Sequence, residues 1–283
     1  MRVGLKIRIN TVLVKVISRV AVKRRRNMDT LHGQAKAGFA KEAQAYERGR
    51  PEYAPELADW LKRELGLRLD SAVLDLGAGT GKFTRLLATV AGEVAAVEPV
   101  DEMRAQLQTR LPGLRALKGT AGEIPLPDAS MDAVACAQAF HWFANEDALR
   151  EIHRVLKPGG SLGLIWNVRD ESCDWVARIS ELLAPYEGDT PRFHSGAWRR
   201  PFEAVRYFAA PALTMFSHSH VGPPEGVIVD RFLSVSFIAA LPDDEKRLFA
   251  EALRRLIYTH PDLRGRDEVA FPYRTEAYRC LRR

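Results

Sequence analysis

The chain has 283 residues, and 46% of them are hydrophobic, which suffices for a substantial core in one large domain or two small ones. The formal net charge is +6, but the first 28 residues hold nine Lys or Arg and no acid. The remaining chain is mildly acidic, with a net charge of about −3, which argues against a broad nucleic-acid-binding surface.

Residues 1–28 form a basic N-terminal extension, which we separate from a single domain expected over 29–283. The longest apolar run of this extension, 12–17, is interrupted by Lys15 and is too short for a signal sequence or a membrane span. The extension is either sequence upstream of a start at Met28, a transit peptide or a basic tail. The three cysteines are far apart and form no CxxC pair, so we expect no metal site and a reducing, cytoplasmic location.

Strand and helix patterns alternate through the first half of the chain. Two helices are predicted within 39–65, where Pro51 and Pro55 separate them. The predicted strands and helices that follow are, in order, 72–79, 82–90, 93–99, 101–111, 114–122, 131–140, 146–156 and 161–167, the last after the turn KPGG. Such alternation implies a mostly parallel sheet with helices on both faces.

The pattern changes after Arg169. The sequence predicts a helix at 175–183, a strand at 212–221, helices at 227–239 and 243–259, and a final strand in 268–281. We interpret these elements as the completion of one α/β sheet of seven strands, with an antiparallel C-terminal strand and a helical insertion. The cofactor-binding core then covers about 70–170, and substrate-side elements lie in 29–69 and 171–265.

The motif DLGAGTG places three glycines at the carboxyl end of the first predicted strand, where open α/β sheets bind ligands. Gly77, Gly79 and Gly81 permit a tight turn and a close backbone approach, and the next helix offers unpaired N–H groups. Two departures separate the motif from the dinucleotide fingerprint. Lys82 replaces the third glycine of that fingerprint, and Asp75 places a carboxylate where a pyrophosphate would arrive.

Two acids indicate the charge of the ligand. A carboxylate at Asp75 prefers an ammonium group, although it could instead satisfy backbone donors of the turn. Glu98 ends the second predicted strand, where an acid can accept both hydroxyls of a ribose. The pair therefore predicts a nucleoside that carries a cationic tail.

Five segments occur together in one order: VLDLGAGTGKFT, AAVEP, GTAGEIPLPDASMDAV, QAFHWF and LREIHRVLKPGGSLGLIWN. They resemble the class I S-adenosylmethionine-dependent methyltransferases over roughly residues 38–170. The resemblance is greatest to a small-molecule branch that includes trans-aconitate and ubiquinone/menaquinone-type enzymes, and the tail PYRTEAYRCLR is also similar to that group. It implies a Rossmann-like fold and S-adenosyl-L-methionine as cofactor.

The resemblance also implies roles for individual residues around the cofactor. Gly77, Ala78 and Gly79 would line its methionine part, Asp75 would lie near its amino group, and Glu98 would hold its ribose.

Three further positions follow from the same resemblance. Thr120 and Ala121 would lie beside the adenine, and many relatives have Asp in place of Thr120, so the adenine amino group could be bound by backbone instead. Gln138, at the end of the fourth strand, would face the methionine part and the substrate.

Methyl transfer from a sulfonium requires chiefly that a nucleophile lies about 3 to 3.5 Å from the methyl group, in line with the C–S bond. Tyr46, Phe39 and Trp142 could contact the sulfonium with their aromatic faces, or could simply be core residues. His141 could accept a proton from the substrate, or could make a structural hydrogen bond. Tyr46, His141 and Gln138 are therefore the candidate catalytic residues.

Two further groups could contact the substrate. Asn167 and Asp170 follow the fifth strand, where they bind substrate or form a turn. The segment PRFHSGAWRRPF is either a cap that selects an anionic compound or a solvated basic loop. Its candidate residues are Arg192, His194, Trp198, Arg199 and Arg200.

The predicted function is methyl transfer to a small molecule. A non-catalytic S-adenosylmethionine-binding protein and a protein methyltransferase remain alternatives. Lys82 and Asp75 disfavour a nicotinamide-dependent oxidoreductase, and QAFHWF stands where a nucleic-acid methyltransferase would carry a motif such as D/N-P-P-Y. We expect no nucleic-acid or membrane partner, and the sequence leaves the acceptor atom and the oligomeric state open.

Overall fold

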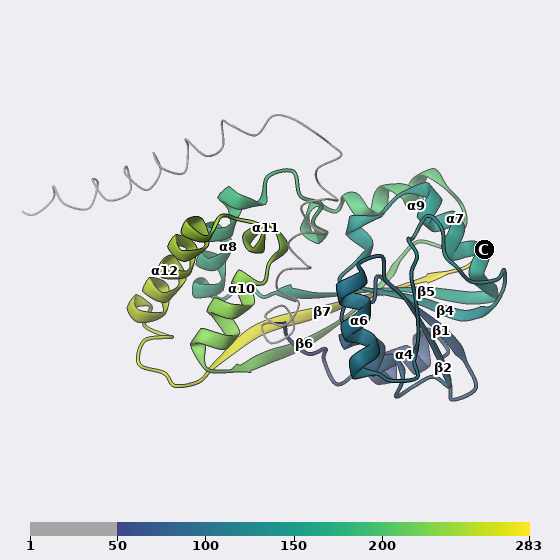
Figure 1. Cartoon of the computed structure of the whole chain (residues 1–283), viewed down its shortest axis with the longest axis horizontal. Helices are drawn as coiled ribbons and strands as arrows, with labels where there is room; N and C mark the ends of the chain where they lie inside the picture. The colour runs from purple at the N-terminus through teal and green to yellow at the C-terminus, as the bar shows by residue number, and fades with distance from the viewer. Residues whose placement is uncertain (1–49) are drawn as a thin grey trace, which may run out of the picture.

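Seven strands form one mixed sheet in the computed structural model, which describes residues 50–283 (Figure 1). Their order is β3-β2-β1-β4-β5-β7-β6. Strands β1 to β5 run parallel, whereas β7 is antiparallel to both β5 and β6, which confirms the predicted Rossmann-like fold class. The strands are β1 (Ala72–Leu76), β2 (Glu93–Val97), β3 (Arg115–Leu117), β4 (Met131–Ala137), β5 (Leu156–Arg169), β6 (Ala212–Gly222) and β7 (Val269–Leu281).

Helices cover both faces of this sheet. The α-helices are α4 (Leu57–Glu64), α5 (Lys82–Leu87), α6 (Asp101–Arg110), α7 (Glu146–Val155), α8 (Asp174–Glu187), α9 (Arg200–Ala204), α10 (Arg231–Leu233), α11 (Ser236–Ala239) and α12 (Asp243–Thr259). Short 3-10 turns are η1 (Phe140–Trp142), η2 (Phe193–Ser195) and η3 (Ala197–Arg199), and η4 (Glu225–Asp230) is a π-helix.

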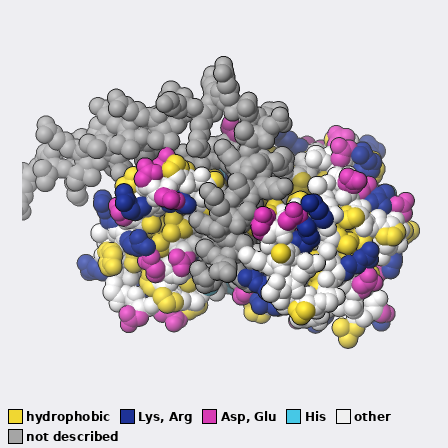
Figure 2. Space-filling model, in the orientation of Figure 1, with side chains coloured by type: hydrophobic (Ala, Val, Ile, Leu, Met, Phe, Trp, Pro, Cys, Tyr) yellow, Lys and Arg dark blue, Asp and Glu magenta, His cyan; other side chains and the backbone are white. Residues whose placement is uncertain are grey.

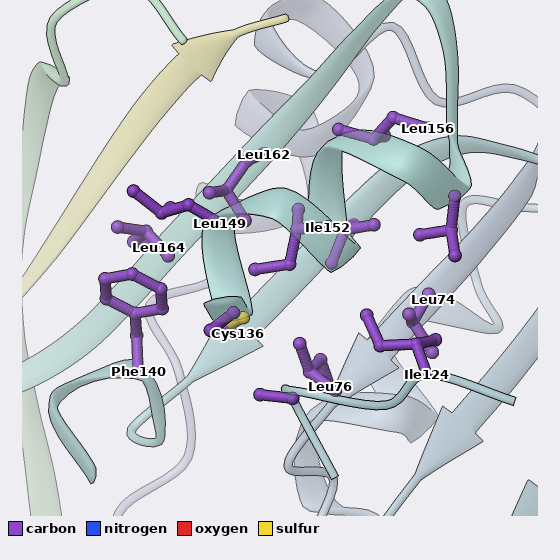
Figure 3. Packing of buried hydrophobic residues seen from close by; sticks show 14 of the residues in the cluster. Leu74, Leu76, Ile124, Cys136, Phe140, Leu149, Ile152, Leu156, Leu162 and Leu164 are labelled. Carbon is purple, nitrogen blue, oxygen red and sulfur yellow. The ribbon is translucent and has the colours of Figure 1, made fainter. Parts of the chain in front are cut away.

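The alternation of side chains along β1 separates the two faces. Val73 packs with residues of α4 and α5, whereas Leu74 packs with residues of α7, because successive strand residues point to opposite faces. Helix α7 begins at Asn145, whose side chain accepts a hydrogen bond from the Ala148 amide at 2.8 Å. Figure 3 shows apolar side chains of α7, among them Ile152, directed at those of β4 and β5.

The junction of α7 and β5 differs from the prediction. The turn KPGG, expected ahead of the strand, lies within the bounds of β5, which begins directly after the helix. The pairing with β4 jumps from Met131–Leu156 to Ala133–Ser161, so the turn bulges out of the ladder. Gly159 has φ 79° there, a conformation that glycine adopts without strain.

A second apolar core lies beside the sheet. Helices α8, α10, α11 and α12 gather on the ends of β6 and β7 that extend past β5 (Figure 1). The stretch 227–239, which was predicted to be helical, divides into η4, α10 and α11 with a break at 234–235. The Ser234 hydroxyl donates to the Arg231 carbonyl at 2.7 Å at this break, and such local bonds compete with helix continuation. The single domain over 29–283 stays a prediction.

Basic and acidic side chains are interspersed over the face of the molecule in Figure 2. Within the described range, no helix is both long and apolar enough to span a bilayer.

Replacement of Ile152 by Ala tests the packing of α7 on the sheet. Ile152 is fully buried, so Ile152→Ala should lower the free energy of unfolding by about 2–5 kcal/mol in urea denaturation. Arg150→Ala, at an exposed position of the same helix where the side chain pairs with exposed Asp147, is the control and should change it by less than about 1 kcal/mol. Equal losses in the two variants would contradict this packing.

Candidate active site

A cavity of about 570 Å³ lies at the carboxyl ends of the parallel strands. The glycine loop after β1, the end of β2, the loop after β3 and the end of β4 all line it. The structure brings together here every residue that was predicted to bind the cofactor. These are Asp75, Gly77, Ala78, Gly79, Glu98, Thr120, Ala121 and Gln138. Their role in cofactor binding stays a prediction at this point.

The glycine loop is fixed by the neighbouring strand. The amides of Gly77 and Ala78 donate to the Val97 carbonyl at 2.9 and 3.2 Å. Gly77 has φ 77°, and a Cβ at this position would lie 2.8 Å from the Cβ of Ala139. A side chain there would be both strained and crowded, so the close turn at the cavity wall requires glycine.

Asp75 is a buried carboxylate in the cavity wall. Its Oδ2 accepts a hydrogen bond from the Thr84 hydroxyl of α5 at 2.6 Å. Its Oδ1 is buried and has no hydrogen-bond partner within 50–283. Burial raises the pKa of Asp75 to about 7, and the charge of Glu98 adds to this shift. A ligand that donates a hydrogen bond to Oδ1 would supply the missing partner and would favour the ionised carboxylate.

Glu98 is held rigidly by two backbone amides. Its Oε2 accepts from the Gly79 amide and its Oε1 from the Val100 amide, both at 2.9 Å. Burial raises the pKa of the Glu98 carboxyl, while these hydrogen bonds oppose the shift. Each carboxylate oxygen can accept a further hydrogen bond, so the pair of oxygens remains suited to two vicinal hydroxyls.

Gln138 adopts a left-handed backbone conformation at the end of β4, with φ 57°. Its amide donates to the Ile165 carbonyl at 2.8 Å, and its side-chain Nε2 donates to the Asn167 carbonyl at 3.4 Å. Non-glycine residues with positive φ are uncommon and gather at functional sites. Gln138 lines the cavity, but its left-handed backbone conformation could not be predicted from the sequence.

His141 does not line the cavity. Its Nδ1 accepts a hydrogen bond from the Trp166 indole at 3.0 Å, which places the proton of the neutral ring on Nε2. Burial lowers the pKa of His141 to about 3, and the charge of Arg192 contributes. The ring therefore has a structural partner, and its role as a base stays a prediction. Trp142 does line the cavity, whereas Tyr46 and Phe39 lie outside the described residues.

Within the predicted substrate cap, Trp198 packs into the core, whereas His194, Arg199 and Arg200 are exposed, and the role of the segment as a cap stays a prediction. Trp198 is buried, and its ring centroid lies 4.8 Å from that of Trp166. Arg199 stacks on Trp198 with its Cζ 4.2 Å from the ring centroid and donates to the Tyr278 hydroxyl at 2.9 Å. None of the cap candidates lines the cavity, and the aromatic packing also excludes a fully solvated loop. Trp198 packs against the core in this way because aromatic side chains bury large apolar areas.

Of the two candidate residues predicted after the fifth strand, only Asn167 lines the cavity. Its Oδ1 accepts from the Thr275 hydroxyl at 2.7 Å, and its Nδ2 donates to the Glu52 carbonyl at 3.0 Å. Asp170 lies outside the lining and accepts hydrogen bonds from the amide and hydroxyl of Ser172, which is the turn role.

Two cationic residues of the cavity wall were missed. Arg50 and Arg231 both line the cavity. Neither belongs to a motif, and the only sequence signal was a basic residue within the mostly apolar stretch GVIVDRFLSV. Arg231 reaches the site because η4 and α10 pack against the sheet.

The raised pKa of Asp75 predicts how the stability of the ligand-free protein depends on pH. The unfolded carboxyl ionises near pH 4 and the folded one near pH 7, so the folded state holds the extra proton between these values. The free energy of unfolding of the wild type, relative to that of Asp75→Asn, should therefore be highest below about pH 4. It should fall by roughly 4 kcal/mol as the pH rises to about 7, since one pKa unit corresponds to about 1.4 kcal/mol.

Urea denaturation of wild type and Asp75→Asn at a series of pH values measures this difference. Asp70→Asn, at an exposed carboxylate, is the control and should follow the wild-type curve. A constant difference between wild type and Asp75→Asn would contradict the buried, half-satisfied carboxyl.

Comparisons with known proteins agree with this architecture. A model of the methyltransferase domain matches residues 74–164. An uncharacterized methyltransferase-like protein of Schizosaccharomyces pombe is 39% identical over 246 residues, which covers 85% of this chain and 93% of the relative.

Two solved structures share the fold. A candidate type II methyltransferase from Anaeromyxobacter dehalogenans superposes with a TM-score of 0.61 at 24% identity, covering 82% of this chain and 97% of the other. The phosphoethanolamine N-methyltransferase 2 of Haemonchus contortus, solved with S-adenosyl-L-methionine, has a TM-score of 0.52 at 16% identity. The match covers 86% of this chain and 57% of the other. The extent of identity to the yeast relative, over nearly its whole length, makes this chain a member of the methyltransferase family.

Proposed function

We propose that the protein transfers a methyl group from S-adenosylmethionine to a small molecule. The observation that carries the proposal is the buried Asp75 residue, which lines the glycine-loop cavity and whose Oδ1 lacks a partner within the described chain. The ligand must supply a hydrogen-bond donor, and an ammonium group is the donor that a carboxylate prefers.

The residues of the cavity fit this cofactor. Asp75 Oδ1 would accept from its amino group, and the two oxygens of Glu98 would accept from its ribose hydroxyls. Gly77 allows the close approach of the methionine part, since a side chain there would collide with Ala139. Thr120 and the adjoining Ala121 line the cavity, where they would flank the adenine.

When bound, S-adenosylmethionine supplies a methyl group already activated on a sulfonium. The remaining task of the protein is to hold the acceptor atom in line and to exclude water. Gln138 is placed for this task by its fixed backbone and by its bond to the Asn167 carbonyl. Trp142 can offer its aromatic face to a cation in the same cavity.

A small acceptor is favoured by the dimensions of the site. A cavity of about 570 Å³ falls within the ordinary range of small-molecule sites. On the face drawn in Figure 2, the described basic and acidic side chains mix and form no continuous basic surface of the kind that nucleic acids require.

Calorimetric titration of the full chain with S-adenosylmethionine, S-adenosylhomocysteine and NAD tests the cofactor. We expect the first two to bind in preference to NAD. Asp75→Asn and Glu98→Gln should each weaken S-adenosylhomocysteine binding by about tenfold or more, because each removes a charge-assisted hydrogen bond. Glu102→Gln, at an exposed acid close to Glu98 in the sequence, is the matched control and should leave the affinity unchanged.

A preference for NAD, or no binding of S-adenosylhomocysteine, would overturn the proposal. Binding that both substitutions leave intact would show that the cofactor lies elsewhere. Tight binding without methyl transfer to any low-molecular-weight acceptor would favour a non-catalytic or protein-directed role.

A further inference from the structure

Arg231 is a buried cation in the wall of the cavity. Its relative exposure is 6%, and its Nε donates to the Tyr273 hydroxyl at 3.3 Å. Its Nη1 is buried without a hydrogen-bond partner among residues 50–283. The same cavity therefore contains a half-satisfied cation as well as the half-satisfied carboxylate of Asp75.

Further guanidinium groups lie around Arg231, among them those of Arg169 and Arg50. The Cζ atoms of Arg169 and Arg231 lie 5.6 and 5.3 Å from the centroid of the same Phe232 ring. The Nε of Arg169 is also buried without a partner in the described part of the chain. Arg50, which lines the cavity, donates from Nη2 to the Ser234 carbonyl at 3.5 Å, just beyond α10.

Acidic side chains balance this group only in part. Glu171 lies 3.6 Å from Arg169, does not line the cavity and is itself largely exposed. Burial and the charge of Arg231 lower the pKa of Arg169. No acid within 4.0 Å of Arg231 occurs in the range 50–283.

A buried guanidinium without a full set of hydrogen-bond partners requires a physical explanation. A buried charge without a partner destabilises the folded chain unless a ligand satisfies it. Asp75 and Glu98 lie around the glycine loop, where they suit an ammonium and a ribose. Arg50 and Lys82 also line the cavity and could face the carboxylate of the cofactor, so Arg231 is left for the other reactant. A planar guanidinium donates two parallel hydrogen bonds to a carboxylate or a phosphate.

We propose that Arg231 binds an anionic group of the methyl acceptor, a carboxylate or a phosphate, at the wall of the cavity formed by α10. The inference rests on the proposed function, because it assigns the second reactant of the same site. Arg231 is then a specificity-determining residue, and Arg50 and Arg169 raise the positive potential around it.

Anion binding by the full chain tests the assignment. Succinate, inorganic phosphate and the neutral analogue succinamide are titrated at constant ionic strength, with and without S-adenosylhomocysteine. We expect succinate or phosphate to bind while succinamide does not, and the stronger of the two anions identifies the group. Arg231→Met should weaken that binding by at least about tenfold, and Arg231→Lys should weaken it less, because it keeps the charge.

Two controls separate binding from folding. Arg255→Met, at an exposed position of α12, should bind the anion as wild type does. The melting temperature of ligand-free Arg231→Met should equal or exceed that of wild type, because the substitution removes an unsatisfied buried charge. S-adenosylhomocysteine affinity should be the same in Arg231→Met and wild type.

Three results would overturn the proposal: equal responses to succinamide and both anions, undiminished anion binding by Arg231→Met, or a tenfold loss of S-adenosylhomocysteine affinity in that variant. The last would assign Arg231 to the carboxylate of the cofactor. Failure of the proposed function is seen separately, as absent S-adenosylhomocysteine binding in wild type, while the anion titration of the cofactor-free protein still reports on Arg231.

Discussion

The site depends on one buried carboxylate at the end of the central strand β1. Asp75 is held from α5 by the Thr84 hydroxyl, and its second oxygen is buried without a partner within 50–283. The parallel strands bring the glycine loop and Glu98 to the same edge of the sheet, and Glu98 fastens the loop through the Gly79 amide. A donor-bearing ligand is needed to complete this arrangement, because burial alone makes the ionised Asp75 unfavourable.

Most of the cofactor side of the site could be predicted because it depends on local rules. The strand ends fix where Asp75, Gly77 and Glu98 lie, and parallel strands place their carboxyl ends together. The position of Arg231 in the cavity wall could not be predicted. It depends on the packing of η4 against β6 and β7 and of α10 against η4. The partner of His141 was equally hidden, because Trp166 lies on a different strand and their contact is a tertiary one.

The wall of the cavity carries charges of both signs, and the fold explains how. The acidic residues come from the parallel half of the sheet, whereas Arg231 belongs to the helical part that packs on the antiparallel extension of β6 and β7 (Figure 1). Each part keeps a polar group incompletely satisfied at the shared cavity. Such groups reduce the stability of the free protein, and they favour a bound state in which a donor satisfies Asp75 and an anion satisfies Arg231.

A crystal structure of the full chain with S-adenosylhomocysteine is the most direct test of the central claim. The account predicts that the amino nitrogen of the ligand lies about 3 Å from Asp75 Oδ1 and that both ribose hydroxyls contact the Glu98 carboxylate. A ligand bound elsewhere, or one whose amino group leaves Asp75 Oδ1 without a donor, would contradict it.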